Sequence, residues 1–272
     1  MVDIWREKLP VRFSNVDRSN RLTLWSIFSF FQEAAISHAE DLGVGWDALV
    51  PAGQAWILSR LSLFVERRPA YGETVQVSTW PRQWEKLFAF RDYEIRDVQD
   101  RAVVRGRAGW LIVDIEKRKP LRVQPILESL PPNEGLDAFP AGPAALKPRE
   151  NLTKKKERAA LYSDIDFYGH VNNARYIQWV QDATDAEILT NADQARLDIN
   201  YLSEVMPGET VELWTAPLNE TVGDSQIIGS ADYPCSPGPG FVYEGRRPGS
   251  GAVFRAELWT GGTGSDKTNS GL

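Results

Sequence analysis

Cysteine and histidine are scarce in this chain, whose 272 residues include one cysteine, Cys235, and two histidines, His38 and His170. One thiol cannot form an internal disulfide. Two histidines far apart in the sequence also lack the close spacing that structural zinc sites show. We therefore expect neither a disulfide nor a metal ion in this protein.

Long apolar runs are absent as well. No segment approaches the roughly 18 consecutive apolar residues that a membrane-spanning helix needs. The first ten residues lack the apolar core of a secretory signal, and no glycine-rich phosphate loop precedes a predicted helix. These absences predict a cytoplasmic protein with no membrane span and no nucleotide, flavin or other cofactor.

Basic residues are outnumbered by acidic ones. The 31 lysines and arginines against 37 aspartates and glutamates give a net charge of −6 and a pI near 5.2. This balance is opposite to that of a nucleic-acid-binding protein. The composition, 42% hydrophobic and 25% charged, is that of an ordinary globular protein.

An internal repeat decides how the chain is organised. At an offset of 149, residues 14–17 align with residues 163–166, and the apolar positions that follow keep this register. At an offset of 136, the Gly-Glu-Thr-Val segment at 72–75 aligns with the same four residues at 208–211. Since 149 minus 136 is 13, the first copy carries 13 extra residues between its two matching blocks.

Each copy is predicted to be one helix followed by strands. Helical spacing of apolar residues predicts a first helix that ends near Gly43 and a second over 173–189. Strand-like runs follow at 56–66, 73–80, 88–96 and 102–113, and then at 195–201, 209–216, 224–232 and 252–260. Such a unit is α+β, with an antiparallel sheet that can wrap its helix, and two copies would pair as a built-in dimer.

Composition also marks the boundaries of the units. Six prolines between positions 125 and 148 predict a linker. The predicted parts are a first unit at 1–128, a linker at 129–157, a second unit at 158–262 and a disordered tail at 263–272. A further Pro/Gly-rich stretch, 234–251, is expected to form a mobile loop.

The richest polar cluster, residues 163–173, stands directly before the second helix. Aspartate, glycine and asparagine are common in turns and helix caps, so a structural role is one interpretation. A calcium loop is a second, but Tyr168 and Arg175 occupy the fifth and twelfth positions, where the loop needs oxygen ligands. The calcium interpretation is therefore rejected.

His170 favours a catalytic interpretation of this cluster. It follows a glycine at the N-terminal mouth of a helix, where N–H groups can polarise a carbonyl oxygen. Its counterpart in the first copy is Arg21, which cannot exchange protons at neutral pH. Only the second copy therefore keeps a titratable group at this place.

Two segments resemble the acyl-acyl carrier protein thioesterases. Residues 166–176 have the pattern Asp-x-x-x-His-Val-Asn-Asn-x-x-Tyr, and residues 110–118 have the pattern Trp-x-x-x-Asp-x-x-Lys-Arg. The resemblance covers about residues 5–218. It implies a tandem, or double, hot dog fold, in which two antiparallel sheets each wrap a long central helix. It also implies a thioester hydrolase that releases fatty acid from its carrier protein.

Carried over by position, the resemblance assigns catalytic roles to Asp166, His170 and Glu204. Two positions depart from the better-known plant pattern: Tyr168 replaces an asparagine, and Val205 replaces a cysteine. A cysteine nucleophile is therefore excluded, because the single thiol lies in the Pro/Gly-rich stretch. The tyrosine leaves open how the thioester carbonyl is held.

The chemistry that we expect is general-base hydrolysis. Glu204 and His170 would position and deprotonate a water molecule, while Asp166 would fix the loop or the imidazole. Backbone N–H groups at the helix mouth would stabilise the oxyanion. Direct carboxylate attack through an anhydride is a lesser alternative. The expected oxyanion and substrate-positioning residues are Val171, Asn172 and Tyr168.

The resemblance further implies that the first unit shapes an acyl pocket, although apolar stripes more often pack a core. The pocket candidates are Trp25, Phe28, Phe31, Trp56 and Leu58. An acidic acyl carrier protein would need a basic surface. The docking candidates are Arg67, Arg68, Lys117, Arg118 and Lys119, with the lysine run 154–156 as a further cluster.

Other functions stay open. A thioesterase acting on coenzyme A esters would use the same fold and chemistry, and a hot dog hydratase or dehydratase also uses aspartate and histidine. A non-catalytic module that binds acyl thioesters is the alternative from a different class. The sequence also leaves open the preferred acyl chain and a homodimer of the tandem chain.

Overall fold

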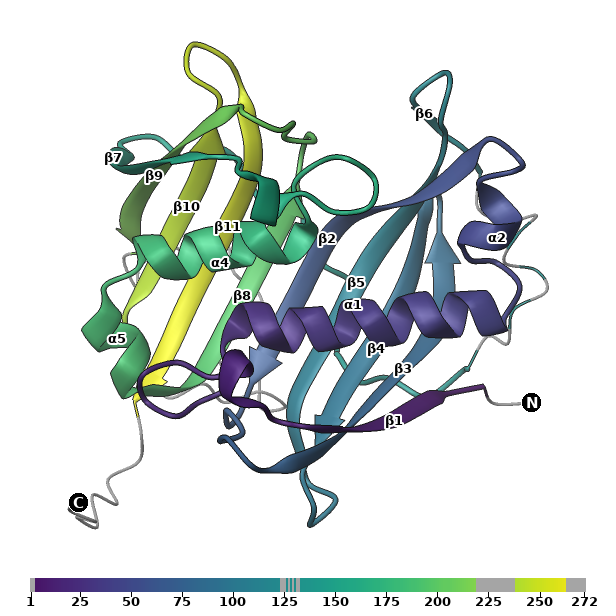
Figure 1. Cartoon of the computed structure of the whole chain (residues 1–272), viewed down its shortest axis with the longest axis horizontal. Helices are drawn as coiled ribbons and strands as arrows, with labels where there is room; N and C mark the ends of the chain where they lie inside the picture. The colour runs from purple at the N-terminus through teal and green to yellow at the C-terminus, as the bar shows by residue number, and fades with distance from the viewer. Residues whose placement is uncertain are drawn as a thin grey trace.

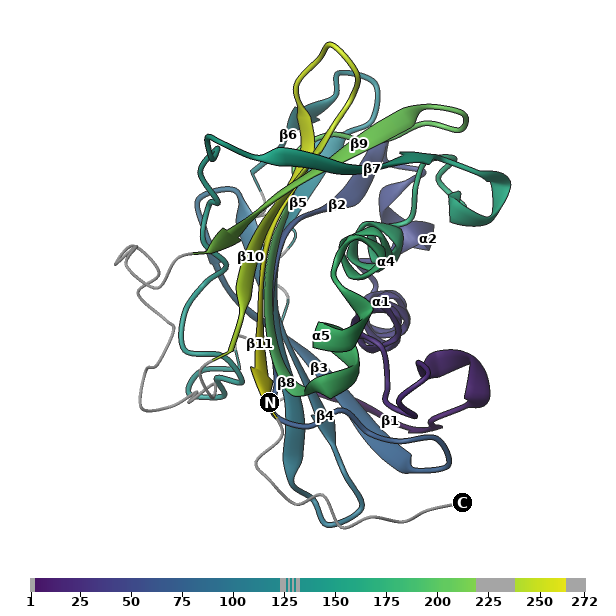
Figure 2. The same cartoon turned by 90° about the vertical axis from the view of Figure 1, so that its left-hand side faces the viewer.

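One curved antiparallel sheet runs through both halves of the chain, with the helices on its concave side (Figures 1 and 2). The computed structural model describes residues 3–122, 126, 128, 130, 133–218 and 238–262. The strands lie in the order β1-β3-β4-β5-β2-β8-β11-β10-β9-β7, with β6 paired to β5. The two predicted sheets are thus joined edge to edge into one.

The first unit confirms the predicted helix and its four long strands. Gly43 has a φ of +69°, in the left-handed region that favours glycine at a helix end. The elements are β1 (Trp5–Pro10), the 3-10 turn η1 (Phe13–Asn15), α1 (Leu24–Asp41), α2 (Trp46–Leu49), β2 (Gln54–Val65), β3 (Thr74–Glu85), β4 (Phe88–Arg96), β5 (Ala102–Asp114) and β6 (Lys119–Pro120).

The second unit repeats this plan with a shorter main helix. Its elements are β7 (Thr153–Ala159), the 3-10 turn η2 (Tyr162–Asp164), α4 (Asn173–Ala183), α5 (Ala186–Asn191), β8 (Ala192–Tyr201), β9 (Thr210–Leu218), β10 (Gly240–Arg246) and β11 (Ala252–Gly262). Strand β7 begins inside the predicted linker, because its residues pair with β9. The linker is therefore shorter than the sequence suggested.

The helix predicted over 173–189 is two helices. Thr184 has an extended backbone, and its hydroxyl donates to the Val180 carbonyl at 2.8 Å. Asp185 then caps α5 by accepting from the Glu187 amide at 2.9 Å. A side chain that caps a new helix start explains the break, which the apolar spacing alone did not reveal.

Strands β2 and β8 hold the two units together. They pair antiparallel from Arg60 opposite Asn200 to Val65 opposite Ala195. The core between sheet and helices is continuous across this junction. Fully buried side chains of both units, such as Phe31 and Trp179, pack in this core. Each stabilises the folded state by about 1.5–3 kcal/mol.

The linker crosses the convex face of the sheet, opposite to the helices (Figure 2). Asp92 accepts from the Ala138 amide at 2.8 Å, and Asn200 accepts from the Leu146 amide at 2.7 Å. The Asn200 side chain also donates to the Ala144 carbonyl at 3.0 Å. Two buried polar side chains therefore fix the path of the linker.

The prediction of a mobile loop over residues 234–251 is partly wrong. Residues 240–246 of the 234–251 stretch form β10, which lies between β9 and β11 in the sheet. Residues 234–237, with Cys235, lie outside the described residues. So do the predicted strand 224–232 and the predicted tail 263–272.

Candidate active site

The turn between η2 and α4 presents His170 at the mouth of the helix. The Asp166 amide donates to the His170 carbonyl at 2.9 Å, and the Asp166 carboxylate accepts from the Tyr168 amide at 2.9 Å. Gly169 has a φ of +85°, a conformation that favours glycine. Asn172 then caps α4 by accepting from the Ala174 amide. The turn residues noted in the sequence thus build a tight loop that ends in the helix.

The structure brings the three predicted catalytic side chains together. His170 Nδ1 lies 3.9 Å from Asp166 Oδ1, and His170 Nε2 lies 3.9 Å from Glu204 Oε1. Both distances exceed that of a hydrogen bond. The Glu204 side chain is 43% exposed and that of His170 is 26% exposed, so water can reach both. The imidazole therefore stands between two carboxylates at the surface.

Burial raises the pKa of the Asp166 carboxyl above its usual value. The Glu204 carboxylate adds to this effect, whereas the His170 ring and the backbone N–H groups of Tyr168 and His170 oppose it. A second carboxylate close by disfavours the charged form of the first. The two carboxylates and the imidazole are therefore close enough for their charges to act on one another.

Glu204 stands on a loop that Arg247 holds. The guanidinium donates to the Glu204 carbonyl and to Ser203 Oγ, the latter at 2.9 Å. It also pairs with the Glu209 carboxylate at 3.1 Å. Sequence reasoning missed Arg247 because it lies in the stretch that we predicted to be a mobile loop. No pattern in the sequence linked that stretch to Glu204.

The two amides predicted to form the oxyanion hole are already engaged. The Val171 amide donates to the Val205 carbonyl, and the Asn172 amide donates to the Asp164 carbonyl, both at 2.9 Å. These bonds anchor the turn to its neighbours, so that part of the expectation is wrong. Within the described residues the amide of Asn173, the first helical residue, donates to no other group. Free N–H groups of this kind are typical of a helix start.

Two protein-family models match the two units. The acyl-ACP thioesterase N-terminal domain matches residues 3–129, and the acyl-ACP thioesterase C-terminal domain matches residues 148–231. The chain belongs to the acyl-ACP thioesterase family. The predicted resemblance is thereby confirmed over both units.

Individual members of the acyl-ACP thioesterase family are similar but distant. An oleoyl-acyl carrier protein thioesterase of Coriandrum sativum is 25% identical over 248 residues, which are 83% of this chain and 66% of that one. A palmitoyl-acyl carrier protein thioesterase of Cuphea hookeriana is 23% identical over 230 residues, 78% of this chain and 54% of that one. The chain thus spans about two thirds or less of these relatives.

Solved structures of the acyl-ACP thioesterase family confirm the tandem hot dog fold. An acyl-ACP thioesterase from Bacteroides thetaiotaomicron has a TM-score of 0.79 at 23% identity, over 94% of this chain and 97% of that one. A 12:0-ACP thioesterase from Umbellularia californica has a TM-score of 0.78 at 18% identity, over 96% of this chain and 98% of that one.

Tyr168, the departure from the plant family pattern, lies beside the imidazole. Its ring is nearly parallel to that of His170, with 6.0 Å between centroids and 12° between planes. Burial raises the pKa of the Tyr168 hydroxyl, with contributions from the carboxylates of Asp166 and Glu40. Tyr168 is therefore a neutral neighbour of the imidazole at neutral pH.

The predicted acyl-pocket residues of the first unit divide into core and partly buried positions. Phe28, Phe31 and Leu58 are at most 2% exposed and belong to the main core, where Phe31 stacks on Tyr93 at 4.7 Å. The half-buried Trp56 donates from Nε1 to the Val44 carbonyl and packs in a smaller apolar cluster with Ala89 and Ile112. The partly buried Trp25 faces Arg175 of α4, its ring centroid 5.6 Å from the guanidinium carbon.

One of the predicted docking residues is wrong. Arg68 is 3% exposed and donates to the Asp17 carboxylate at 2.7 Å, so it cannot meet a carrier protein. The Arg67 side chain is 29% exposed and makes two bonds to the Glu73 carboxylate, at 2.8 and 2.9 Å, and its docking role stays a prediction. The three other predicted residues lie in the exposed turn after β5, where Lys117 pairs with Asp114; they are Lys117, Arg118 and Lys119.

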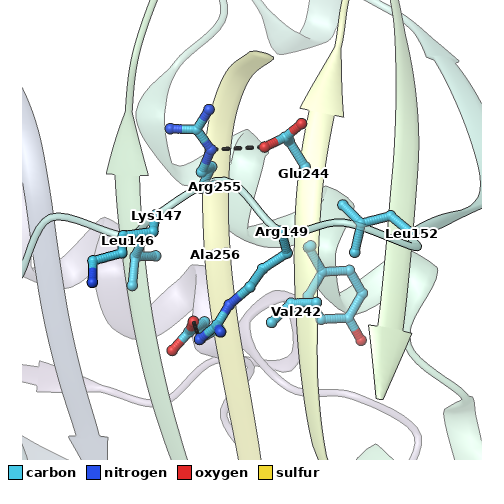
Figure 3. Close-up of a pocket in the computed structure, with 10 residues that line it drawn as sticks. Leu146, Lys147, Arg149, Leu152, Val242, Glu244, Arg255 and Ala256 are labelled. Atoms are coloured by element: carbon cyan, nitrogen blue, oxygen red, sulfur yellow. Dashed lines mark hydrogen bonds and ion pairs between the residues drawn. The ribbon is translucent and has the colours of Figure 1, made fainter. Parts of the chain in front are cut away.

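A hollow on the second unit is lined by the linker and by strands β10 and β11 (Figure 3). The linker forms one wall, where Arg149 pairs with Glu257 at 3.1 Å. Neighbouring residues of a strand point to opposite faces of the sheet. In β10, the Tyr243 hydroxyl bonds to Thr184 at the end of α4, on the helix side of the sheet. Glu244 therefore lies on the opposite side, where it pairs with Arg255. The hollow therefore belongs to the linker contact and not to the candidate active site.

Two features of the described residues bear on other functions. No group of three histidine, cysteine or carboxylate side chains there has the arrangement of a metal site. No helix within that part of the chain is long and apolar enough to span a membrane.

Proposed function

We propose that this protein hydrolyses the thioester of a fatty acyl-acyl carrier protein and releases free fatty acid, as part of fatty acid biosynthesis. The observation that best supports this function is the position of the His170 imidazole between the Asp166 and Glu204 carboxylates, at the N-terminus of α4. It occurs in the unit that matches the C-terminal domain of a thioesterase family. An imidazole flanked by carboxylates is a suitable general base.

In the proposed reaction, Asp166 faces Nδ1 of His170 and selects the tautomer whose Nε2 accepts a proton. A water molecule held by Glu204 and Nε2 loses that proton and attacks the thioester carbonyl. The Asn173 amide at the helix start stabilises the resulting oxyanion. The C–S bond then breaks, and the imidazolium returns its proton to the leaving sulfur.

Apolar side chains on the catalytic loops support a fatty substrate. Exposed apolar side chains occur in the two loops that carry the trio: Leu161, Tyr162, Phe167, Tyr168, Leu202 and Met206. Exposed apolar groups beside a reactive centre are typical of surfaces that bind apolar ligands. An acyl chain that approaches the imidazole would bury part of this surface.

The deciding experiment measures thiol release from acyl carrier proteins that bear chains of six to eighteen carbons, with His170→Ala as the control. We expect release with the wild-type chain and a loss of at least ~100-fold in turnover with the variant. Absence of thiol release from every acyl chain would overturn the proposed function. Retained acyl binding without turnover would favour the non-catalytic module.

The same acyl chain on coenzyme A separates the two possible handles. We expect a higher kcat/KM for the carrier protein, because the exposed basic turn at Arg118 and Lys119 can meet its acidic surface. Equal values would favour an acyl-coenzyme A thioesterase. Reversible hydration of an enoyl thioester without thiol release would indicate a hydratase.

Two further parts of the proposal concern the location of the protein and its oligomeric state. We place the reaction in the cytoplasm. Fractionation of cells that express the chain tests this location. The catalytic trio lies within one chain, so hydrolysis needs no second copy. Light scattering on the purified chain tests for a homodimer, and activity that falls on dilution would contradict an active monomer.

A further inference from the structure

Helix α2 of the first unit touches the catalytic turn of the second. The Trp46 ring lies edge-on to Phe167, with centroids 4.6 Å apart, and edge-on to Tyr168 at 5.0 Å. Tyr168 in turn lies parallel to the His170 ring. A chain of aromatic contacts thus runs from one unit to the imidazole of the other.

The 13 extra residues of the first copy lie in the part of the chain that makes this contact. They fall between the matching blocks of the repeat, the region that holds α2. The second unit has α5 at the corresponding place, directly before its first long strand. The two units therefore differ in the short helix that follows the main helix.

Helix α2 is held firmly at its start. The Glu40 carboxylate accepts from the Trp46 amide at 2.6 Å, as a capping group does. The Val44 carbonyl just before it accepts from Trp56 Nε1 at 2.8 Å. Trp46 is thus fixed by α1 on one side and by β2 on the other.

The opposite contact is present but polar. Arg18 of the first unit, the counterpart of Phe167 at an offset of 149, donates to Glu187 at 2.5 Å and to Thr190 at 3.0 Å. Both acceptors lie in α5 of the second unit. Each turn is therefore braced by the short helix of the other unit, and only the catalytic turn has an aromatic brace.

We propose that Trp46 is a positioning residue for the thioester hydrolysis and acts through Tyr168 on the orientation of the His170 ring. This inference rests on the proposed function. The physical reason is that large rigid rings restrict a turn more than exposed polar contacts do. The first unit thereby completes the active site of the second.

Three variants test the role of Trp46 in the full chain. Trp46→Ala should lower kcat by ~10- to 100-fold, because a small displacement of a catalytic group has effects of this size. KM should change little, and Trp46→Phe should restore most of kcat. Glu187→Ala combined with Thr190→Ala removes the polar brace of the other turn and should leave kcat unchanged.

A second readout does not depend on turnover. The chain has two histidines, so His170→Ala assigns the ring signals of His170 in an NMR spectrum of histidine-labelled protein. We expect these signals to shift or broaden in Trp46→Ala and to stay unchanged in the Glu187→Ala/Thr190→Ala chain. If the wild type hydrolyses no thioester, the proposed function fails, and the NMR comparison still tests the brace.

Three results would overturn the positioning role. One is a wild-type kcat and unchanged His170 signals in Trp46→Ala. Another is an equal loss of kcat in the Glu187→Ala/Thr190→Ala chain, which would indicate a general role in unit docking. Should Trp46→Ala fail to fold, Trp46→Leu removes the aromatic contacts to Phe167 and Tyr168 with a smaller loss of volume, and unchanged His170 signals in that variant would count against the brace.

Discussion

The turn before α1 and the turn before α4 have the same backbone and opposite chemistry. Three backbone hydrogen bonds recur in the two turns. Two keep the offset of 149 at both ends: Asp17 to Arg21 and Asp166 to His170, and Thr23 to Asn15 and Asn172 to Asp164. In the third, Leu22 to Pro69 and Val171 to Val205, the donors differ by 149 and the acceptors by 136, the second offset of the repeat. The Val171 and Asn172 amides were expected to bind an oxyanion. Their counterparts in the first turn, the Leu22 and Thr23 amides, make the same bonds, although that turn has no histidine. Their role is therefore to hold the turn.

The side chains distinguish the two turns. In the first, the buried Arg68 closes onto Asp17 at 2.7 Å, and Arg21 lies 3.4 Å from Asp193. In the second, the place of Arg68 is taken by Glu204 and that of Arg21 by His170. A closed ion pair leaves no acceptor for a proton from water, whereas the imidazole between two carboxylates provides one. One scaffold thus serves structure in one unit and is suited to chemistry in the other.

The largest expected effect breaks the chemistry of the second turn. His170→Ala and Glu204→Gln should each lower kcat by at least ~100-fold, the usual range for a general base. Arg21→Ala, the matched change in the first turn, should leave kcat close to the wild-type value. Steady-state thiol release measures all three, and near-wild-type activity in both second-turn variants would remove the mechanism.

The next effect breaks the ion pair of the first turn. Arg68→Met leaves Asp17 without its buried partner and should lower the free energy of unfolding by roughly 2–3 kcal/mol, below the upper values for buried pairs because Asp17 keeps contact with water. Urea denaturation measures the change. Activity per folded molecule should stay unchanged, and a fall in kcat without loss of stability would contradict the division of roles.

A smaller effect separates the two histidines. Burial lowers the pKa of His38, and the charge of Arg91 adds to this, against the opposing carboxylates of Asp3 and Asp41. Because the folded pKa lies below the unfolded value near 6.5, His38 favours the folded state above pH 6.5, and this stability is lost as the pH falls below it. Thermal unfolding should show this decline in the wild type.

His38→Gln is the matched variant for that pH series. An amide can accept from Arg91 without titrating, so the decline in melting temperature below pH 6.5 should become less steep. His170→Gln, at a partly exposed position, serves as the comparison and should keep the decline. Parallel pH profiles for the wild type and His38→Gln would show that His38 is not the group responsible.

The smallest effect concerns docking. Arg118→Glu with Lys119→Glu should raise KM for the acyl carrier protein a few-fold at low salt, and the difference should vanish at high salt as screening increases. Arg6→Glu with Lys8→Glu on the edge strand β1 makes the same charge change elsewhere. A KM that is independent of salt in the wild type would argue against electrostatic docking.

Much of the fold was predictable because burial on one face leaves a periodic pattern. The apolar spacing from Ile27 to Ala34 gave α1, and β4 at Phe88–Arg96 matches its predicted run at both ends. Strand β10 was not predicted, because the Gly- and Pro-rich residues around it are typical of a loop. The site was predictable where its residues share one turn, as with Asp166 and His170.

Contacts between distant segments were beyond sequence reasoning. Arg247 reaches the Glu204 loop across more than forty residues, and Trp46 reaches Phe167 from the other unit. The prediction that Arg68 docks a partner is wrong because the charge of a residue does not show whether its side chain is buried. Such pairings depend on how the two units dock, which no local pattern encodes.

The duplication, the order of a helix and then strands in each copy, and the absence of a histidine at position 21 follow from the sequence, because repeats and periodicity are local and linear. The folded arrangement is needed to tell which amides are free, which arginines are buried and how one unit contacts the turn of the other. The reason is physical: hydrogen bonding and burial depend on three-dimensional neighbours, and the joining of β2 to β8 chooses those neighbours.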